Sequence, residues 1–122
     1  YEKAKNRLSC YNCHIIKKFS LEAVKDFADH SLDFVYIDGD HNFQNVTNDI
    51  AEWSKKIKES GIIAGHDCDK HKKTTNIHVY EVVYGYTSAY RIRPWFLLAA
   101  KSVINGIIGP EARTFMWIKQ KS

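Results

Sequence analysis

SLDFVYIDGDH, at residues 31–41, and SGIIAGHD, at residues 60–67, each contain a short apolar run that ends in Asp and His. Between them, apolar residues from Phe43 to Ile57 recur every three or four positions, which predicts an amphipathic helix. The order strand, helix, strand is typical of a parallel α/β sheet, whose strand carboxyl ends form one edge where ligands bind. We therefore expect one cluster at that edge, made of Asp38, Asp40, His41, His66 and Asp67.

The spacing of apolar residues also predicts the helices and strands on either side of these two motifs. The first part of the chain is expected to hold a helix over 2–11, a strand over 14–19, a helix over 21–29 with Ser20 as its N-cap, a strand over 33–37 buried on both faces, and, after a helix stopped at 59–61, a strand over 62–64. The second part is expected to hold a loop over 68–76, a helix around 79–86, an outer strand over 92–99, a Gly/Pro loop over 105–112 and a final strand over 114–119. These elements form one α/β domain over residues 1–122.

The amino-acid composition argues against several classes of function. The chain has 122 residues, of which 44% are apolar and 26% charged, as expected for one modest soluble domain. Its net charge of +4 comes with scattered lysines rather than a basic stripe, which argues against nucleic-acid binding. No apolar run is long enough to span a membrane, and three cysteines do not make a disulfide framework. We expect a cytoplasmic protein.

Two Asp residues at neighbouring strand ends suggest a cation site. Asp38 follows an apolar run, where a carboxylate is costly unless it is paired or solvated in a cleft. Asp67 repeats this position one strand later, so the two carboxylates could share Mg²⁺ or another divalent ion. His41 and His66 are both candidate proton acceptors, because imidazole titrates near neutral pH. Asp40 is better explained as a residue that supports the start of the following helix.

A zinc site is the alternative use of the cysteines. Cys10, Cys13, Cys68 and His71 have C-x₂-C…C-x₂-H spacing. The predicted strands argue against this site, because Cys13 precedes one strand and Cys68 follows another. Parallel strands of about six residues would separate the two pairs by roughly 20 Å.

The IDGDH and GIIAGHD motifs, with a Trp-containing helix between them, resemble the class I S-adenosylmethionine-dependent methyltransferases. The resemblance covers roughly residues 8–67 and is strongest to bacterial small-molecule and sugar O-methyltransferases related to the catechol type. It implies a three-layer Rossmann-like sheet, mostly parallel, with an antiparallel C-terminal strand and the strand order 3-2-1-4-5-7-6. The strands of this chain would be the third to the seventh.

The resemblance also implies roles for individual residues. Ser20 matches the position near the cofactor adenine, and Asp38 also lies on the cofactor side. Asp38 and Asp67 match the metal ligands of metal-dependent members, with a small molecule as methyl acceptor. Where catechol-type enzymes have Asn after the second acid, this chain has Cys68.

The family's first two strands and glycine-rich loop have no counterpart here, and no G-x-G-x-x-G occurs. The chain starts at Tyr1 without Met, and we expect an N-terminally truncated domain that binds S-adenosylmethionine weakly. A sheet that lacks those strands exposes an apolar edge, which predicts a homodimer through that edge or by strand swapping.

Two other functions remain open. Asp38-Gly39-Asp40 fits the D-x-D pattern of metal-dependent glycosyltransferases, although this pattern leaves GIIAGHD unexplained. The third possibility is a non-catalytic α/β domain that keeps the fold without the activity.

Overall fold

The computed structural model describes residues 1–70, 75–98, 103–104, 107–108 and 113–121. Its helices are α1 (Glu2–Leu8), α2 (Ser20–Ala23), the 3-10 helix η1 (Val24–Asp26), α3 (Phe43–Lys56) and α4 (Val79–Ala89). Its strands are β1 (Leu32–Ile37), β2 (Ile57–Gly65), β3 (Trp95–Leu98), β4 (Val103–Ile104), β5 (Ile107–Ile108) and β6 (Thr114–Ile118).

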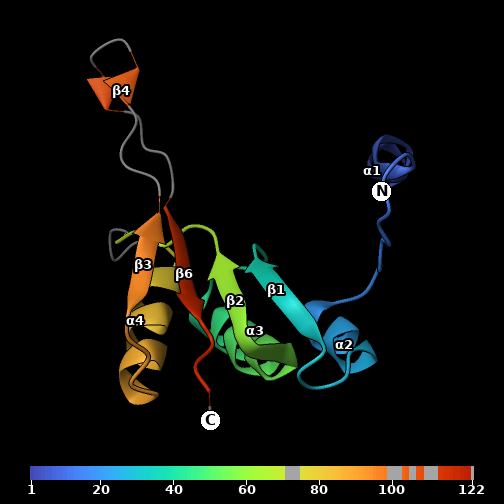
Figure 1. Ribbon diagram of the computed structural model, residues 1–122. Helices are drawn as coiled ribbons and strands as arrows, with labels where there is room; N and C mark the ends of the chain where they lie inside the picture. Colours follow the sequence, from blue (N-terminus) through green and yellow to red (C-terminus); the bar gives the residue numbers. More distant parts are fainter. Residues whose placement is uncertain (71–74, 99–102, 105–106, 109–112, 122) are drawn as a thin grey trace.

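A four-stranded sheet in the order β1-β2-β6-β3 forms the centre of the molecule (Figure 1). β1 and β2 are parallel, whereas β6 is antiparallel to both of its neighbours, β2 and β3. This arrangement confirms the predicted Rossmann-like α/β class. Of the three layers expected, the described residues form two, the sheet and one layer of helices. It also matches the last four positions of the expected order, with the C-terminal strand inserted between its two predecessors.

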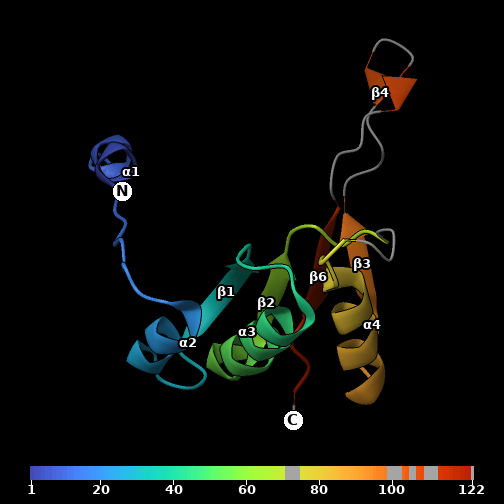
Figure 2. The same cartoon turned by 180° about the vertical axis from the view of Figure 1, so that it is seen from behind.

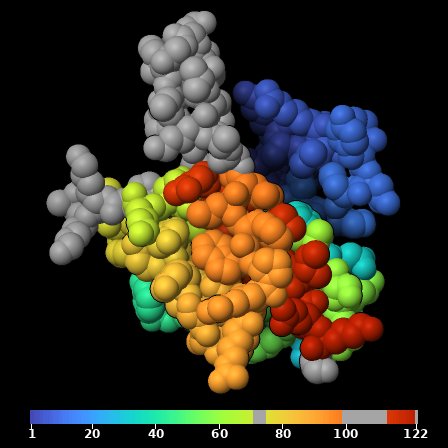
Figure 3. All heavy atoms as spheres, turned by 60° about the vertical axis from the view of Figure 1, so that its left-hand side comes forward, coloured from blue at the N-terminus to red at the C-terminus, as the bar shows by residue number. Residues whose placement is uncertain are grey.

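The helices α2, α3 and α4 all lie on one face of the sheet, as the two opposite views show (Figures 1 and 2). The core between these layers contains Ile50 of α3, Val83 of α4, Ile63 of β2, and Phe115 and Trp117 of β6, all nearly inaccessible to solvent. In Figure 3 the side chains of α4 and β3 form a continuous flank of the molecule.

The opposite face of the sheet is bare within the described residues. Strand side chains alternate between faces, and the alternate set is exposed: Phe34, Tyr36, Phe96, Leu98 and Ile118, each between 43% and 53% accessible. The prediction that residues 33–37 are buried on both faces is therefore wrong. β1 is an edge strand, and only one of its faces has a helical layer against it.

Both ends of α3 are held by side chains. Asn42 is the N-cap, and its side chain accepts a hydrogen bond from the backbone of Asn45 at 2.9 Å. At the other end, Nζ of Lys119 donates to the carbonyls of Ser54 and Ile57 at 2.9 and 2.7 Å. The helix ends at Lys56 and the strand begins directly at Ile57, so the predicted stop at 59–61 is wrong.

The N-terminal arm departs most from expectation. α1 is helical as predicted, but residues 14–19 form no strand, because no other described segment pairs with them. The helix predicted over 21–29 is one turn of α-helix followed by one turn of 3-10 helix. Phe19, not Ser20, is the N-cap residue of α2, so Ser20 begins the helix and its hydroxyl is used elsewhere.

The C-terminal half follows the predictions more closely. α4 confirms the predicted helix, β3 is the edge strand next to Pro94, and β6 confirms the final strand. Within the predicted loop 105–112, Ile107 and Ile108 instead pair with β4. Residues 71–74 of the predicted loop 68–76, the rest of 105–112 and Ala99 lie outside the described residues. None of the described helices is long and apolar enough to cross a membrane.

Candidate active site

The carboxyl ends of β1 and β2 bring the two sequence motifs together. Ile37 and Gly65 are register partners in the parallel pair, so Asp38 and His66 leave neighbouring strands at the same level. The backbone N–H of His66 donates to the carbonyl of Ile37 at 3.0 Å, which extends the ladder by one residue. The arrowheads of these strands lie side by side in Figure 1. The structure brings Asp38, His41, His66 and Asp67 together as expected. Asp40, the fifth residue of the expected cluster, is hydrogen-bonded to Asn42 and Asn45 instead.

Asp67 lies at the centre of this cluster. Its Oδ2 is 2.6 Å from Nε2 of His41 and 3.2 Å from Nδ1 of His66. Asp38 is farther out, with its Oδ1 4.0 Å from the same His41 nitrogen. One ligand atom from each of Asp38, His66 and Asp67 lies within 4.8 Å of the other two, a spacing that one metal ion could bridge.

Nε2 of His41 is buried and has no hydrogen-bond partner among the described residues. Its 2.6 Å contact with Asp67 is therefore close in distance without the geometry of a hydrogen bond. A buried nitrogen beside two carboxylates that lacks such a bond is unusual, since buried polar atoms are nearly always paired. The arrangement suits a site that takes up a ligand.

The backbone around Asp67 is held in a left-handed conformation, with φ of 56°. Asp tolerates this region better than most residues, although it is still less stable than the extended backbone. The flanking residue Cys68 anchors it by donating its N–H to the carbonyl of Arg113 at 2.9 Å. Arg113 in turn donates from its backbone N and Nε to Asp69, at 2.8 and 2.6 Å. The start of β6 thus fixes the turn that carries Asp67.

Gly65 is required by packing rather than by backbone angle. A Cβ at this position would lie 2.5 Å from the ring of Phe115 and 2.6 Å from the carbonyl oxygen of Ile37. Phe115 is fully buried in the core. The glycine therefore lets the end of β2 approach β1 and β6 closely, which places the next two residues, His66 and Asp67, at the edge.

The turn after β1 is stabilised by Asp40 and His78. Asp40 accepts from the backbone of Asn42 at 3.0 Å and from the side chain of Asn45 at 2.8 Å, and these bonds lower its pKa. His78 donates its backbone N–H to the carbonyl of His41 at 2.9 Å, and its Nδ1 accepts from Phe43. Both oxygens of Asp40 therefore support the start of α3, as the sequence predicted.

Ser20 lies apart from the cluster and lines a neighbouring pocket of about 450 Å³. Its hydroxyl accepts a hydrogen bond from Nε1 of Trp53 at 2.8 Å, which joins α2 to α3. The pocket is lined by residues of α2, α3 and the turn after β1: Lys18, Phe19, Ser20, Leu21, Gly39, Asp40, Asn45, Asn48 and Asp49. Gly39 and Asp40 lie in the turn between Asp38 and His41, so this pocket adjoins the cluster.

Asp49 is the buried acid of this pocket. Burial raises its pKa, and a hydrogen bond from the Ser20 side chain opposes that rise. Only 6% of the residue is accessible to solvent. A carboxyl group that retains its proton more readily than usual can donate as well as accept a hydrogen bond.

Cys68 does not face the site. It is completely buried in the hydrophobic core, and burial raises the pKa of its thiol to about 12. A metal would require the thiolate, so Cys68 is unsuited to replace the Asn of catechol-type enzymes. Cys10 and Cys13 are exposed near α1, and His71 lies outside the described residues.

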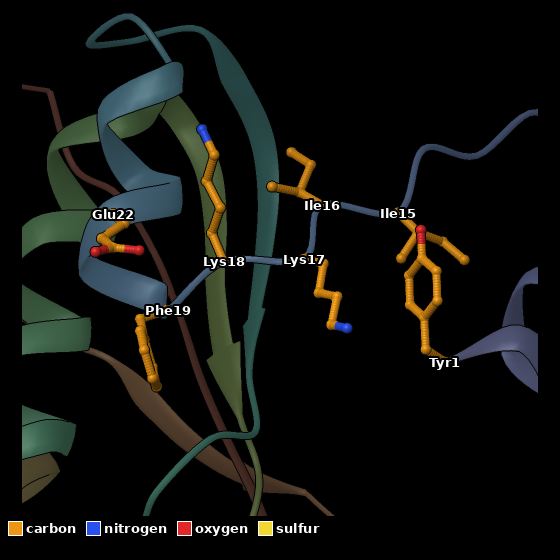
Figure 4. A pocket seen from close by; sticks show the side chains of 7 residues that line it. All are labelled: Tyr1, Ile15, Ile16, Lys17, Lys18, Phe19 and Glu22. Carbon is orange, nitrogen blue, oxygen red and sulfur yellow. The ribbon is translucent and has the colours of Figure 1, made fainter.

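A second pocket, of about 560 Å³, lies between the N-terminal arm and α2 (Figure 4). Its lining comes from Tyr1, residues 15–19 and Glu22, and includes no residue of the Asp/His cluster. Nζ of Lys17 lies 5.1 Å from the centre of the Tyr1 ring, and Lys18 is paired with Asp26. This pocket has one acid, Glu22, and no imidazole in its lining, unlike the site at the strand ends.

Residues 3–68 of the chain match a protein family described as "Methyltransferase domain". The chain belongs to this family. The match covers more than half of the chain and ends just after the GIIAGHD motif. The recognition as a class I methyltransferase fold, made from the two motifs, is confirmed.

Similar proteins place this methyltransferase domain in longer chains. It is 29% identical over 110 residues to the "Uncharacterized protein y4gI" of Sinorhizobium fredii, covering 82% of this chain and 11% of that protein. A SAM dependent methyltransferase from Archaeoglobus fulgidus has the same fold, with a TM-score of 0.59 at 16% identity, covering 88% of this chain and 68% of its own. A protein from Clostridium thermocellum gives a TM-score of 0.61 at 12% identity over 99% and 66% of the two chains. The domain thus spans about a ninth of the curated relative's length.

Sequence reasoning missed three residues that shape the candidate site or the pocket beside it. Asp49 lies on the apolar stripe of α3 between Val46 and Ile50. A charged residue among buried apolar positions could have identified it from the sequence. Asn42 directly precedes the helix, in the position typical of an N-cap. His78 precedes α4, but its bonds to His41 and Phe43 join segments far apart in the sequence, and no local pattern reveals them.

Proposed function

We propose that this domain takes part in S-adenosylmethionine-dependent O-methylation of a small molecule, with a divalent cation at Asp38 and Asp67. The observation that carries the proposal is the Asp/His cluster at the carboxyl ends of β1 and β2, next to a pocket lined by Ser20. Ligands of open α/β sheets bind in this crevice. Membership in the methyltransferase family supports the same reaction class.

The residues present fit a cation. Two carboxylates and an imidazole supply the oxygen and nitrogen donors that divalent metals use, and the buried Nε2 of His41 lacks a hydrogen bond. Asp38 and His66 are partly exposed, which leaves room for an acceptor oxygen and water beside the ion. When bound, the cation would lower the pKa of an acceptor hydroxyl and orient it.

Other residues of the chain bind the cofactor and accept the proton. The pocket beside Ser20, Gly39 and Asp49 holds the adenosine part of S-adenosylmethionine, with the Asp49 carboxyl as a hydrogen-bonding group. Its volume of about 450 Å³ lies in the range of small-molecule sites. His41 and His66 are the two candidates for taking the acceptor proton. Orientation of the acceptor oxygen towards the methyl donor is the main catalytic contribution expected.

Cofactor binding is tested by NMR titration of the ¹⁵N-labelled chain with S-adenosylhomocysteine. We expect weak binding, with amide shifts concentrated at Ser20, Gly39 and Asp49. A Ser20→Val variant should weaken binding, whereas Ser31→Val, in an exposed turn, serves as the matched control. An absence of shifts at millimolar ligand, or shifts confined to the N-terminal arm, would refute the cofactor assignment.

Methyl transfer is tested with radiolabelled S-adenosylmethionine and a panel of vicinal diols and phenols. We expect slow transfer that stops with a chelator and falls by at least about tenfold in Asp67→Asn, since metal ligands matter at least as much as their supporting residues. Asp33→Asn is the control, because Asp33 is exposed and pairs with Lys58, away from the Asp/His cluster. Transfer that is unaffected by the chelator and by Asp67→Asn would remove the metal from the mechanism.

We also propose that two copies of the chain associate through the exposed β1 edge. β1 has a strand neighbour on one side only, and its bare face carries Phe34 and Tyr36. An unpaired edge beside apolar side chains favours pairing with a second chain.

A further inference from the structure

His66 is close enough to Asp38 and Asp67 to complete a metal site with them. It directly precedes Asp67, and one of its ring nitrogens belongs to the group of ligand atoms that lie within 4.8 Å of one another. His41 is not a member of that group, although it contacts Asp67. The two histidines also differ in access, because Nε2 of His41 is buried whereas the side chain of His66 is 39% exposed.

Cys68, the residue that follows Asp67, cannot supply the third donor. It is completely buried in the hydrophobic core, among residues of α3, α4 and β6. The third donor must then come from another residue of the same edge. Within the described part of the chain, His66 offers a ring nitrogen within 4.8 Å of ligand atoms of both carboxylates.

We propose that Asp38, His66 and Asp67 form a mixed nitrogen and oxygen site that binds a transition metal such as Mn²⁺, Co²⁺ or Zn²⁺ in preference to Mg²⁺. This inference rests on the proposed metal-assisted function and specifies the ion. Imidazole suits transition metals, whereas Mg²⁺ favours oxygen ligands and retains its waters. One imidazole in place of an oxygen donor therefore changes which ions bind.

With His66 bound to the metal, His41 is the residue that accepts the proton of the acceptor hydroxyl. Its Nε2 lies 2.6 Å from Asp67 and 4.0 Å from Asp38, and its backbone is fixed by the bond from His78. The site thus has one histidine on the metal and one beside it.

Binding and ligand identity can be measured without any enzymatic assay. Mn²⁺ bound to the full chain should show nitrogen modulation from a coordinated imidazole in pulsed electron paramagnetic resonance. The His66→Asn variant should lose this signal and at least about tenfold of its Mn²⁺ affinity by calorimetry, with Mg²⁺ affinity unchanged. His41→Gln should retain the nitrogen signal, and circular dichroism checks that both variants are folded.

Three results would overturn the proposal: no nitrogen signal in the wild-type chain, loss of the signal in His41→Gln but not in His66→Asn, or equal affinity for Mg²⁺ and Mn²⁺. The wild-type spectrum decides the first case even if a variant fails to fold. Because S-adenosylmethionine takes no part in these measurements, failure of cofactor binding would leave them valid. A metal bound through His66 without cofactor binding would refute the methyltransferase proposal alone.

Discussion

The two faces of the sheet have similar side chains and very different surroundings. On one face, Phe115 and Trp117 are almost completely buried beneath α3 and α4. On the other, Phe34, Phe96 and Ile118 leave between 43% and 53% of their surface exposed. The same period-two alternation produces both faces, so the difference comes from which helices are present to cover them. The covered face stabilises the strands, whose carboxyl ends then position the Asp/His cluster.

The largest expected effect compares two phenylalanines on opposite faces. Phe115→Ala should destabilise the protein by about 3–5 kcal/mol, because it leaves a cavity in the core. Phe96→Ala, on the bare face, should cost about 1 kcal/mol or less. Urea unfolding of the two variants measures both values. Similar losses would mean that the bare face is covered in solution.

Lys119 links the covered layer to the sheet by binding the end of α3. Lys119→Met should cost about 1.5–3 kcal/mol, since it removes charged hydrogen bonds to the carbonyls of Ser54 and Ile57. Lys121→Met, at an exposed position nearby, is the control. Equal stability of the two variants in urea would show that these bonds contribute little.

The bare face also gives a prediction about association. Light scattering at high concentration should show a dimer, and Phe34→Ser should weaken it at least about tenfold, or roughly 1.4 kcal/mol. Tyr84→Ser removes an equally exposed aromatic residue from α4 and should leave the dimer intact. A strictly monomeric wild-type chain would contradict the proposed edge pairing.

The smallest effect concerns Asp49, a carboxyl group on the covered side. Burial raises its pKa in the folded protein, so its contribution to stability is present at low pH and is lost as pH rises through the folded pKa. Asp49→Asn should therefore be more stable than the wild type near neutral pH, with the difference vanishing in acid. Unfolding free energies measured between pH 3 and 8 would show this trend. A difference in unfolding free energy that grows towards low pH would contradict the raised pKa of Asp49.

The sequence predicted the centre of the fold because its signals there are local and strong. The apolar runs before Asp38 and Asp67, separated by a periodic helix, define a parallel pair and its functional edge. The strand predicted over 14–19 is not formed, because a strand depends on a partner that the apolar run itself does not specify. The bare face was missed for the same reason, since Phe34 and Tyr36 have the composition of a buried strand.

The sequence identified the residues of the candidate site but could not assign a separate role to each histidine. Asp38 and Asp67 were identified from their positions at strand ends, and the structure brings them together. His41 and His66 could not be distinguished, because their relation to Asp67 depends on the left-handed turn at Asp67 and on the bond from His78. The burial of Cys68 depends on core packing and was likewise not apparent from spacing.

The most direct test of the central claim is the location of a bound paramagnetic ion. Substoichiometric Mn²⁺ added to the ¹⁵N-labelled chain should broaden the amide signals of residues 38–41 and 66–68 first, and Asp38→Asn should abolish this local effect. Broadening that is uniform over the chain, or that begins at Cys10 to His14, would contradict a cation site at the ends of β1 and β2.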